Sequence, residues 1–131
     1  MQTLVKHSER FFYLTPVQKT DRPILAAVVG NHQTLFIDAG NSENHAKLFQ
    51  EYLTNLGIKG DYLVLTHSHW DHVFGLGQMK MPVIAQSKTA AKLKKMQTLS
   101  WEDAELDQRV QEGVEIPFCA DAIKLELGHE R

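Results

Sequence analysis

The stretch LTHSHWDHVFG, residues 65–75, is decisive for interpreting this sequence, because it concentrates side chains that bind metals. His67, His69 and His72 occur there together with Asp71. Residues two apart in extended backbone project from the same face, so His67 and His69 can meet one metal ion. Asp71 and His72 follow at a turn and point elsewhere, which suits a second ion. The spacing therefore predicts a site for two metal ions.

The donor atoms in this stretch indicate which metals suit it. Imidazole nitrogen and carboxylate oxygen together fit zinc, and also iron or manganese, whereas calcium and magnesium prefer oxygen ligands. The alternative is a purely structural cluster, in which each buried imidazole left unpaired costs about 1–3 kcal/mol. The other four histidines stand apart in the sequence and are predicted to be surface residues or hydrogen-bonded core residues: His7, His32, His45 and His129.

Length and composition limit the classes of protein. A chain of 131 residues, 43% hydrophobic, suits one domain with a sizeable core. The net charge of -2 gives no field that attracts nucleic acid or an anionic membrane, so we expect a small-molecule substrate. No apolar run has the length of a signal peptide or membrane span, which predicts a cytoplasmic protein. The single cysteine, Cys119, excludes an intramolecular disulfide and a zinc–thiolate cluster within one chain.

The first half of the chain predicts strands followed by a helix. Three short apolar runs are predicted to form antiparallel strands: 10–17, 23–30 and 33–40. A helix is predicted over 41–57, with Asn41 or Ser42 as its N-cap and Gly57 as its stop. The run 61–67 is apolar at consecutive positions, which is typical of an interior strand covered on both faces.

The second half predicts one more strand and two helices. The strand is expected over 81–86 and the helices over 87–100 and 100–113, the second opened by a capping box from Ser100 to Asp103. This order favours an α/β layered domain. The histidine stretch begins where the buried strand 61–67 ends, and ligands of open α/β sheets bind beyond the carboxyl ends of strands. We expect Gly75 to permit a close approach to the sheet. Trp70 is expected either to line the site or to pack, and Trp101 and Phe118 to pack.

At this point the sequence resembles the metallo-β-lactamase fold superfamily. HSHWDH, residues 67–72, matches the superfamily's H-x-H-x-D-H signature, and LFIDAG, residues 35–40, matches its upstream aspartate motif at Asp38. Four segments also look like a group of largely uncharacterised bacterial hydrolases within the superfamily: TDRPILAAVVG, IDAGNS, SWEDAELDQRV and EIPFC. The resemblance extends over nearly the whole chain.

The resemblance implies an architecture and a set of roles. The chain would be the N-terminal half of an αββα sandwich, a mixed sheet with helices on one face. His67 and His69 would hold a first zinc ion and Asp71 and His72 a second, with iron or manganese as alternatives. Asp71 would also orient the attacking hydroxide, and Asp38 would lie behind the ligands and orient them.

The sequence departs from the family's pattern after His72. In the family a third histidine, a bridging aspartate and a last histidine come from the C-terminal half, and here the only later histidine is His129. His129 is expected to be either a ligand of the first zinc or a turn residue. The sequence therefore predicts a single, incomplete domain over 1–131, with an apolar sheet face that has no opposing sheet.

Two functions remain open at this stage. The first is a metal-dependent hydrolase of an ester, thioester, lactone, amide or phosphoester, for which this chain supplies one half. The second is a truncated, noncatalytic half that binds metal weakly or associates with itself. Its partners would be another copy of the chain or a complementing C-terminal half.

Overall fold

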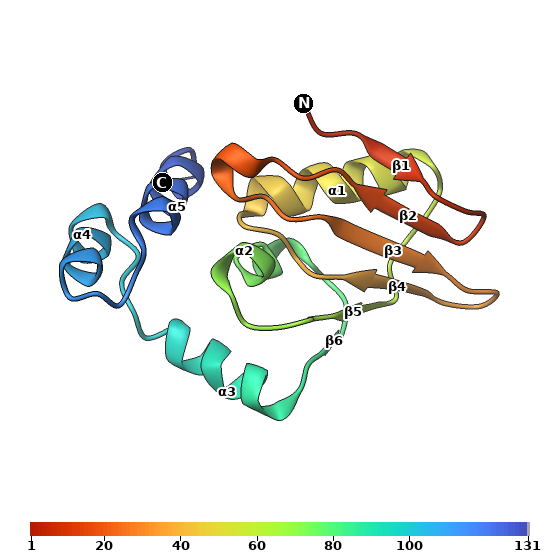
Figure 1. Cartoon of the computed structure of the whole chain (residues 1–131). Helices are drawn as coiled ribbons and strands as arrows, with labels where there is room; N and C mark the ends of the chain where they lie inside the picture. The colour runs from red at the N-terminus through yellow and green to blue at the C-terminus, as the bar shows by residue number, and fades with distance from the viewer. Residues whose placement is uncertain (131) are drawn as a thin grey trace.

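A six-stranded mixed sheet forms the centre of the computed structural model, which describes residues 1–130 (Figure 1). The strands lie in chain order: β1 (Leu4–Lys6), β2 (Phe11–Leu14), β3 (Leu25–Val29), β4 (Thr34–Ile37), β5 (Tyr62–Val64) and β6 (Val83–Ile84). β1 to β4 are antiparallel, whereas β5 and β6 run parallel to β4. The predicted antiparallel start and the interior position of β5 are confirmed.

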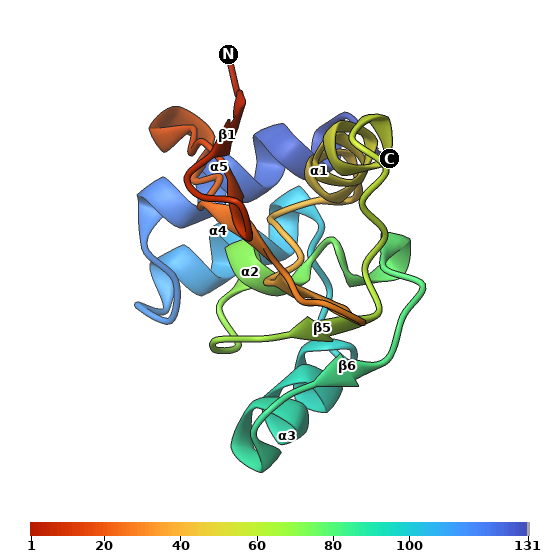
Figure 2. The same ribbon diagram turned by 90° about the vertical axis from the view of Figure 1, so that its right-hand side faces the viewer.

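The helix α1 (Glu43–Asn55) covers one face of this sheet, as the edge-on view in Figure 2 shows. Alternate strand residues point toward it, because side chains of a strand alternate between faces. The buried core under α1 includes Phe36 of β4 and Phe49 of α1, whose rings lie 5.3 Å apart. The predicted mixed sheet with a helical layer on one face is confirmed.

The ends of α1 follow from its sequence. The Ser42 hydroxyl accepts a hydrogen bond from the backbone N–H of His45 at 3.1 Å, so Ser42 rather than Asn41 is the N-cap. At the other end Gly57 adopts a φ of 73°, a left-handed conformation that glycine adopts without strain. The predicted start and stop of this helix are therefore both found in the structure.

Four further helices follow β5 along the chain. They are α2 (Trp70–Val73), α3 (Ser87–Met96), α4 (Asp103–Gln111) and α5 (Pro117–Gly128). α4 and α5 lie together, beyond α2, at one end of the sheet (Figure 1). They share a second core cluster with α2, formed by Trp70, Leu106, Ala120, Ala122 and Ile123. Two one-turn 3-10 helices complete the chain, Gln18–Thr20 and Leu76–Gln78.

Three details of the sequence prediction need correction. The capping box from Ser100 to Asp103 is wrong, because α4 begins at Asp103 and its N-cap, Glu102, makes no side-chain cap hydrogen bond. Phe118 does not pack into a core, because it is 48% exposed on the outer surface of α5. The edge strand β1 and the helix α5 were not predicted at all. Among residues 1–130, no helix is long and apolar enough to cross a membrane.

Candidate metal centre

The loop after β5 carries the histidine cluster. The chain leaves the sheet after Leu65, whose N–H donates to the Ile84 carbonyl at 3.0 Å. His69 keeps extended backbone and precedes α2, whose single turn carries Asp71 and His72. Gly75 then passes so close to the β4–α1 loop that a Cβ there would lie 2.1 Å from the Ala39 carbonyl oxygen. The close approach expected at Gly75 is confirmed, and it fixes the position of α2.

The three imidazoles meet in space. The ring centroids of His67 and His69 lie 4.6 Å apart, and those of His67 and His72 lie 4.1 Å apart. His69 is exposed, whereas His67, His72 and Asp71 are half-buried. Within residues 1–130, however, no three His, Cys, Asp or Glu side chains are positioned to hold one metal ion together. The donors are gathered at one place, but they do not form a complete shell.

Asp38 anchors this cluster from behind. It follows β4 with a φ of 65°, a conformation that aspartate tolerates better than most side chains. Its carboxylate accepts hydrogen bonds from the Thr66 N–H at 2.8 Å, the Thr66 hydroxyl at 2.8 Å and His72 Nδ1 at 2.7 Å. Burial alone would raise the pKa of Asp38, but these hydrogen bonds outweigh it and lower the pKa. Asp38 therefore remains an anion that orients its neighbours.

The hydrogen bonds also determine which ring nitrogens are free. His72 uses Nδ1 on Asp38, and its Nε2 lies 3.4 Å from Asp71 Oδ2. Burial lowers the pKa of His72, but the bond to Asp38 and the charge of Asp71 raise it overall. His67 Nδ1 lies 2.8 Å from the Thr66 hydroxyl. Since the single hydroxyl proton goes to the Asp38 carboxylate, His67 Nδ1 carries its own proton and its Nε2 lone pair is free.

Asp21 lies near this cluster, and the sequence did not predict it. It follows the first 3-10 helix with a φ of 57°. Burial raises its pKa, as does the charge of Asp71, while the charges of His72 and His69 lower it. Asp21 therefore lies within electrostatic reach of the predicted ligands. No local signal identified it, because its neighbours in the cluster lie about 50 residues further along the chain.

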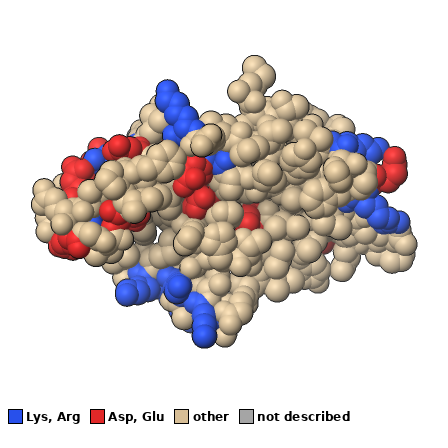
Figure 3. All heavy atoms as spheres, viewed as in Figure 1, with Lys and Arg blue, Asp and Glu red and all other residues tan. Residues whose placement is uncertain are grey.

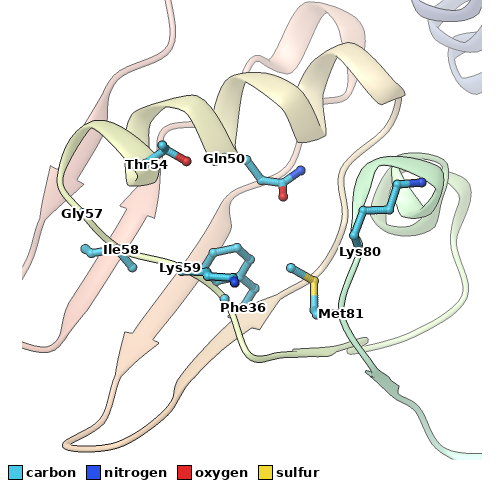
Figure 4. A pocket seen from close by; sticks show the side chains of 9 residues that line it. Phe36, Gln50, Thr54, Gly57, Ile58, Lys59, Lys80 and Met81 are labelled. Atoms are coloured by element: carbon cyan, nitrogen blue, oxygen red, sulfur yellow. The ribbon is translucent and has the colours of Figure 1, made fainter.

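The other predicted residues lie away from the cluster. Trp70 packs in the second core cluster, next to Phe74, with ring centroids 5.7 Å apart. His129 is the exposed C-cap residue of α5. His45 is buried and hydrogen-bonded, as predicted for an isolated histidine. A cavity of about 480 Å³ lies at the amino-terminal end of β5, whereas the histidine loop follows its carboxyl end. The cavity is lined by Phe36, Ile58, Met81 and two lysines, among others, and its lining contains no histidine (Figure 4).

Fold and site together define a class of protein: an α/β domain with a loop of histidines and aspartates at the carboxyl end of a sheet strand. The sequence model of the metallo-β-lactamase superfamily matches residues 20–113, a range that includes both Asp38 and the histidine loop. The chain belongs to the metallo-β-lactamase superfamily. Among curated proteins, none matches the chain.

Solved structures share this fold over part of their length. A metallo-β-lactamase from Pontibacter korlensis is 18% identical with a TM-score of 0.64, over 76% of this chain and 50% of that one. The DIM-1 metallo-β-lactamase is 19% identical with a TM-score of 0.63, over 75% and 48%. The mono-zinc form of FIM-1 from Pseudomonas aeruginosa is 13% identical with a TM-score of 0.61, over 72% and 46%. The chain spans about half the length of these structures, consistent with the predicted half of a sandwich.

Proposed function

We propose that this chain supplies the N-terminal half of a metal-dependent hydrolase of the metallo-β-lactamase superfamily. The observation that carries the proposal is the gathering of three imidazoles, with ring centroids 4.1–4.6 Å apart, in front of the buried Asp38 carboxylate. A purely structural cluster would pair its imidazoles internally. Here His67 uses only its Nδ1, on Thr66, and keeps its Nε2 for a ligand. His72 Nδ1 is held by Asp38, and its Nε2 lies 3.4 Å from Asp71, its proposed partner at the second ion.

The donor set fits half of a two-metal site. His67 and His69 would hold one ion, and Asp71 and His72 a second. Nitrogen and carboxylate donors suit zinc, with iron or manganese as alternatives, and the mono-zinc form of the neighbour FIM-1 supports zinc. Since residues 1–130 offer no three convergent donors, we infer that the remaining ligands come from outside them. Residues 1–131 would accordingly be one incomplete domain.

The protein's own residues would position the reactants. Asp38 holds His72 in one ring orientation through the 2.7 Å bond to Nδ1. The Asp71 carboxylate would accept a proton from the attacking water and aim it at the substrate. The bound metal supplies Lewis-acid polarisation and lowers the pKa of water to about 7. The substrate class is a small ester, thioester, lactone, amide or phosphoester.

A second function is favoured by the incomplete donor set. Two ligands for each ion would hold metal weakly, and the chain would then be a noncatalytic half that binds metal loosely or associates with itself. Metal retention separates the two functions, because an organised half-site holds more metal through dialysis than a chain without its ligand histidines.

The test is the metal content of the purified chain after dialysis, by elemental analysis. The variants are His67→Ala/His69→Ala and Asp38→Asn, and the matched control is His7→Ala/His32→Ala, at two exposed histidines. We expect more zinc in the unmodified chain and the control than in the double ligand variant, which keeps only the Asp71–His72 pair, and about 10–100-fold weaker binding in Asp38→Asn. Metal no higher in the unmodified chain than in the ligand variant would refute the hydrolase proposal and support the noncatalytic half.

A further inference from the structure

The cavity of about 480 Å³ between α1 and the amino-terminal end of β5 has no part in the proposed function. It lies on the side of the sheet that α1 covers, because its lining includes Phe36 of the core cluster together with Gln50 and Thr54 of α1. Its volume is within the range of about 300–1,000 Å³ that is typical of small-molecule sites. The strand β5 separates it from the histidine loop, so a ligand bound here occupies a site of its own.

The base of the cavity is apolar and fixed in place. Phe36 lies there almost fully buried, and its ring packs edge-on against that of Phe49, with centroids 5.3 Å apart. The backbone of Gly60 lies against the same ring, so that a Cβ at residue 60 would come within 2.6 Å of it. Ile58 and Met81 line the cavity and pack against this core cluster. A ligand therefore meets a preformed apolar surface, which costs little to organise.

The walls of the cavity are joined to each other. Gln50 and Thr54 project from α1, and Met81 comes from the segment before β6 (Figure 4). The Gln50 side-chain nitrogen donates to the Gln78 carbonyl at 2.9 Å, which ties α1 to the segment that continues into Met81. The cavity thus has an apolar base, a polar wall on α1 and a hydrogen bond that holds its two sides together.

The charged side chains that line the cavity are both positive. They are Lys59 and Lys80, and the lining found within residues 1–130 contains no Asp or Glu. Lys80 Nζ donates to the Gly77 carbonyl at 2.7 Å and points away from Met81 in Figure 4. Lys59 is exposed and forms no ion pair with another residue of 1–130. Of the two, Lys59 is the cation available to a ligand.

Nearby negative charge is turned away or balanced. The carboxyl end of α1 carries partial negative charge, but the Leu53 carbonyl already accepts the Ile58 N–H at 2.9 Å. The Asp61 carboxylate accepts a backbone N–H of β4 at 2.7 Å. Glu51 lines an adjoining hollow together with Lys47, one charge of each sign. On the face that Figure 3 shows, acidic side chains gather mainly around α4, at the far end of the sheet from the start of β5. An anion is therefore favoured beside Lys59.

We propose that this cavity binds a small amphipathic monocarboxylate. Its apolar body lies on Ile58 and Met81, above Phe36, and removes these side chains from water. Its carboxylate pairs with the Lys59 ammonium at the rim. One available ammonium matches a single negative charge, whereas a phosphate group carries more charge and more acceptors than one lysine satisfies. No metal takes part, so this inference does not rest on the proposed function.

The probe is phenylbutyrate, and its uncharged analogue is phenylbutanol. Both are titrated into the metal-free chain, so that no ion at the histidine loop can bind the carboxylate. The chain has four methionines, and isotope-labelled methyl groups report on each of them by NMR. We expect a saturable shift at Met81, with a Kd on the order of 1 mM for phenylbutyrate and about fivefold weaker binding of phenylbutanol. Met96, on α3 and outside the cavity lining, should not shift.

Two lysine variants test the assigned cation. Lys59→Gln removes the charge at an exposed position, and Lys92→Gln makes the same change at an exposed lysine of α3 as the matched control. Lys59→Gln should weaken phenylbutyrate about fivefold and leave phenylbutanol unchanged, because an exposed ion pair contributes modestly. Lys92→Gln should change the binding of neither compound.

Four results would overturn the proposal. They are no saturable shift at Met81, equal binding of the acid and the alcohol, equal losses from the two lysine variants, and shifts at Met96 as large as those at Met81. The last result would show adsorption to apolar surface in general. Metal retention without binding at Met81 refutes this inference alone, and binding at Met81 in a chain that retains no metal refutes only the proposed function.

Discussion

At the scale of single residues, the buried side chains of Asp38 and His45, near the β4–α1 loop, have different roles. Asp38 is held as an anion by three hydrogen bonds and faces the histidine cluster. His45 is fully buried one turn into α1, and its Nδ1 accepts a hydrogen bond from the Asn41 N–H at 3.2 Å. Since that nitrogen must keep its lone pair, His45 is neutral in the folded protein. Asp38 orients the candidate metal ligands, whereas His45 stabilises the fold.

His45 should make the protein sensitive to mild acid. Burial, with a smaller contribution from the Arg22 charge, lowers the pKa of His45 from 6.5 to about 3. The unfolded chain therefore binds one more proton between these pH values, so stability rises with pH there and is lost as pH falls below about 6.5. From pH 6.5 to 4.5 we expect the free energy of unfolding to fall by roughly 2–3 kcal/mol.

Urea unfolding at several pH values measures this dependence, with His45→Gln as the comparison. The variant lacks the titrating ring, so its slope between pH 6.5 and 4.5 should be much shallower. The lowered pKa values of Asp38 and Glu126 act at lower pH, and the raised pKa of His72 acts above 6.5. Equal slopes for the two proteins would show that His45 is not the responsible group.

At the scale of elements, a buried ion pair joins α5 to the rest of the chain, in addition to its packing in the second core cluster. The Arg22 guanidinium donates from Nε and Nη2 to the two Glu126 oxygens at 2.9 and 3.0 Å, and both side chains are largely buried. The pKa of Glu126 is lowered because the Arg22 hydrogen bonds and charge outweigh the effect of burial. This pair joins α5 to the segment before β3, across most of the chain.

Glu126→Gln should destabilise the protein by about 3–5 kcal/mol, because it leaves the Arg22 charge buried without its partner. The matched control is Asp107→Asn, which breaks the ion pair between Asp107 of α4 and Lys124 of α5, the helix that also carries Glu126. That pair is exposed, so little change is expected. Chemical denaturation compares the two variants, and similar losses from both would contradict the assigned role of the buried pair.

The difference between local sequence pattern and long-range contact explains what the sequence could and could not predict. β2 to β5 and α1 were predicted because their apolar positions repeat with the period of a strand or helix. β1 was missed because three residues show no period. α5 was missed because it is held by a partner 104 residues away. For the site, spacing predicted that His67 and His69 come together, whereas the closer approach of His72 to His67 and the contributions of Asp21 and Thr66 required the folded chain.

The whole molecule has two core clusters, one under the sheet and one among α2, α4 and α5. Phe74 packs against both clusters, with its ring 4.8 Å from that of Trp101. Met96 is the other side chain packed against both, among residues 1–130. Phe74 therefore connects the apolar packing of the two clusters, beside the Arg22–Glu126 ion pair.

Phe74→Ala should separate the unfolding of the two clusters. Trp70 belongs to the second cluster and Trp101 packs against it, so fluorescence reports on this cluster, while far-ultraviolet circular dichroism reports on the sheet and α1 as well. In the unmodified chain the two denaturation curves should coincide, as for a cooperative domain of this size. In Phe74→Ala the fluorescence transition should move to lower denaturant than the dichroism transition, with a total loss of about 3 kcal/mol. Phe118→Ala removes an exposed phenylalanine of α5 and should leave the curves together. If the Phe74→Ala curves shift but still coincide, the clusters form one unit through other contacts.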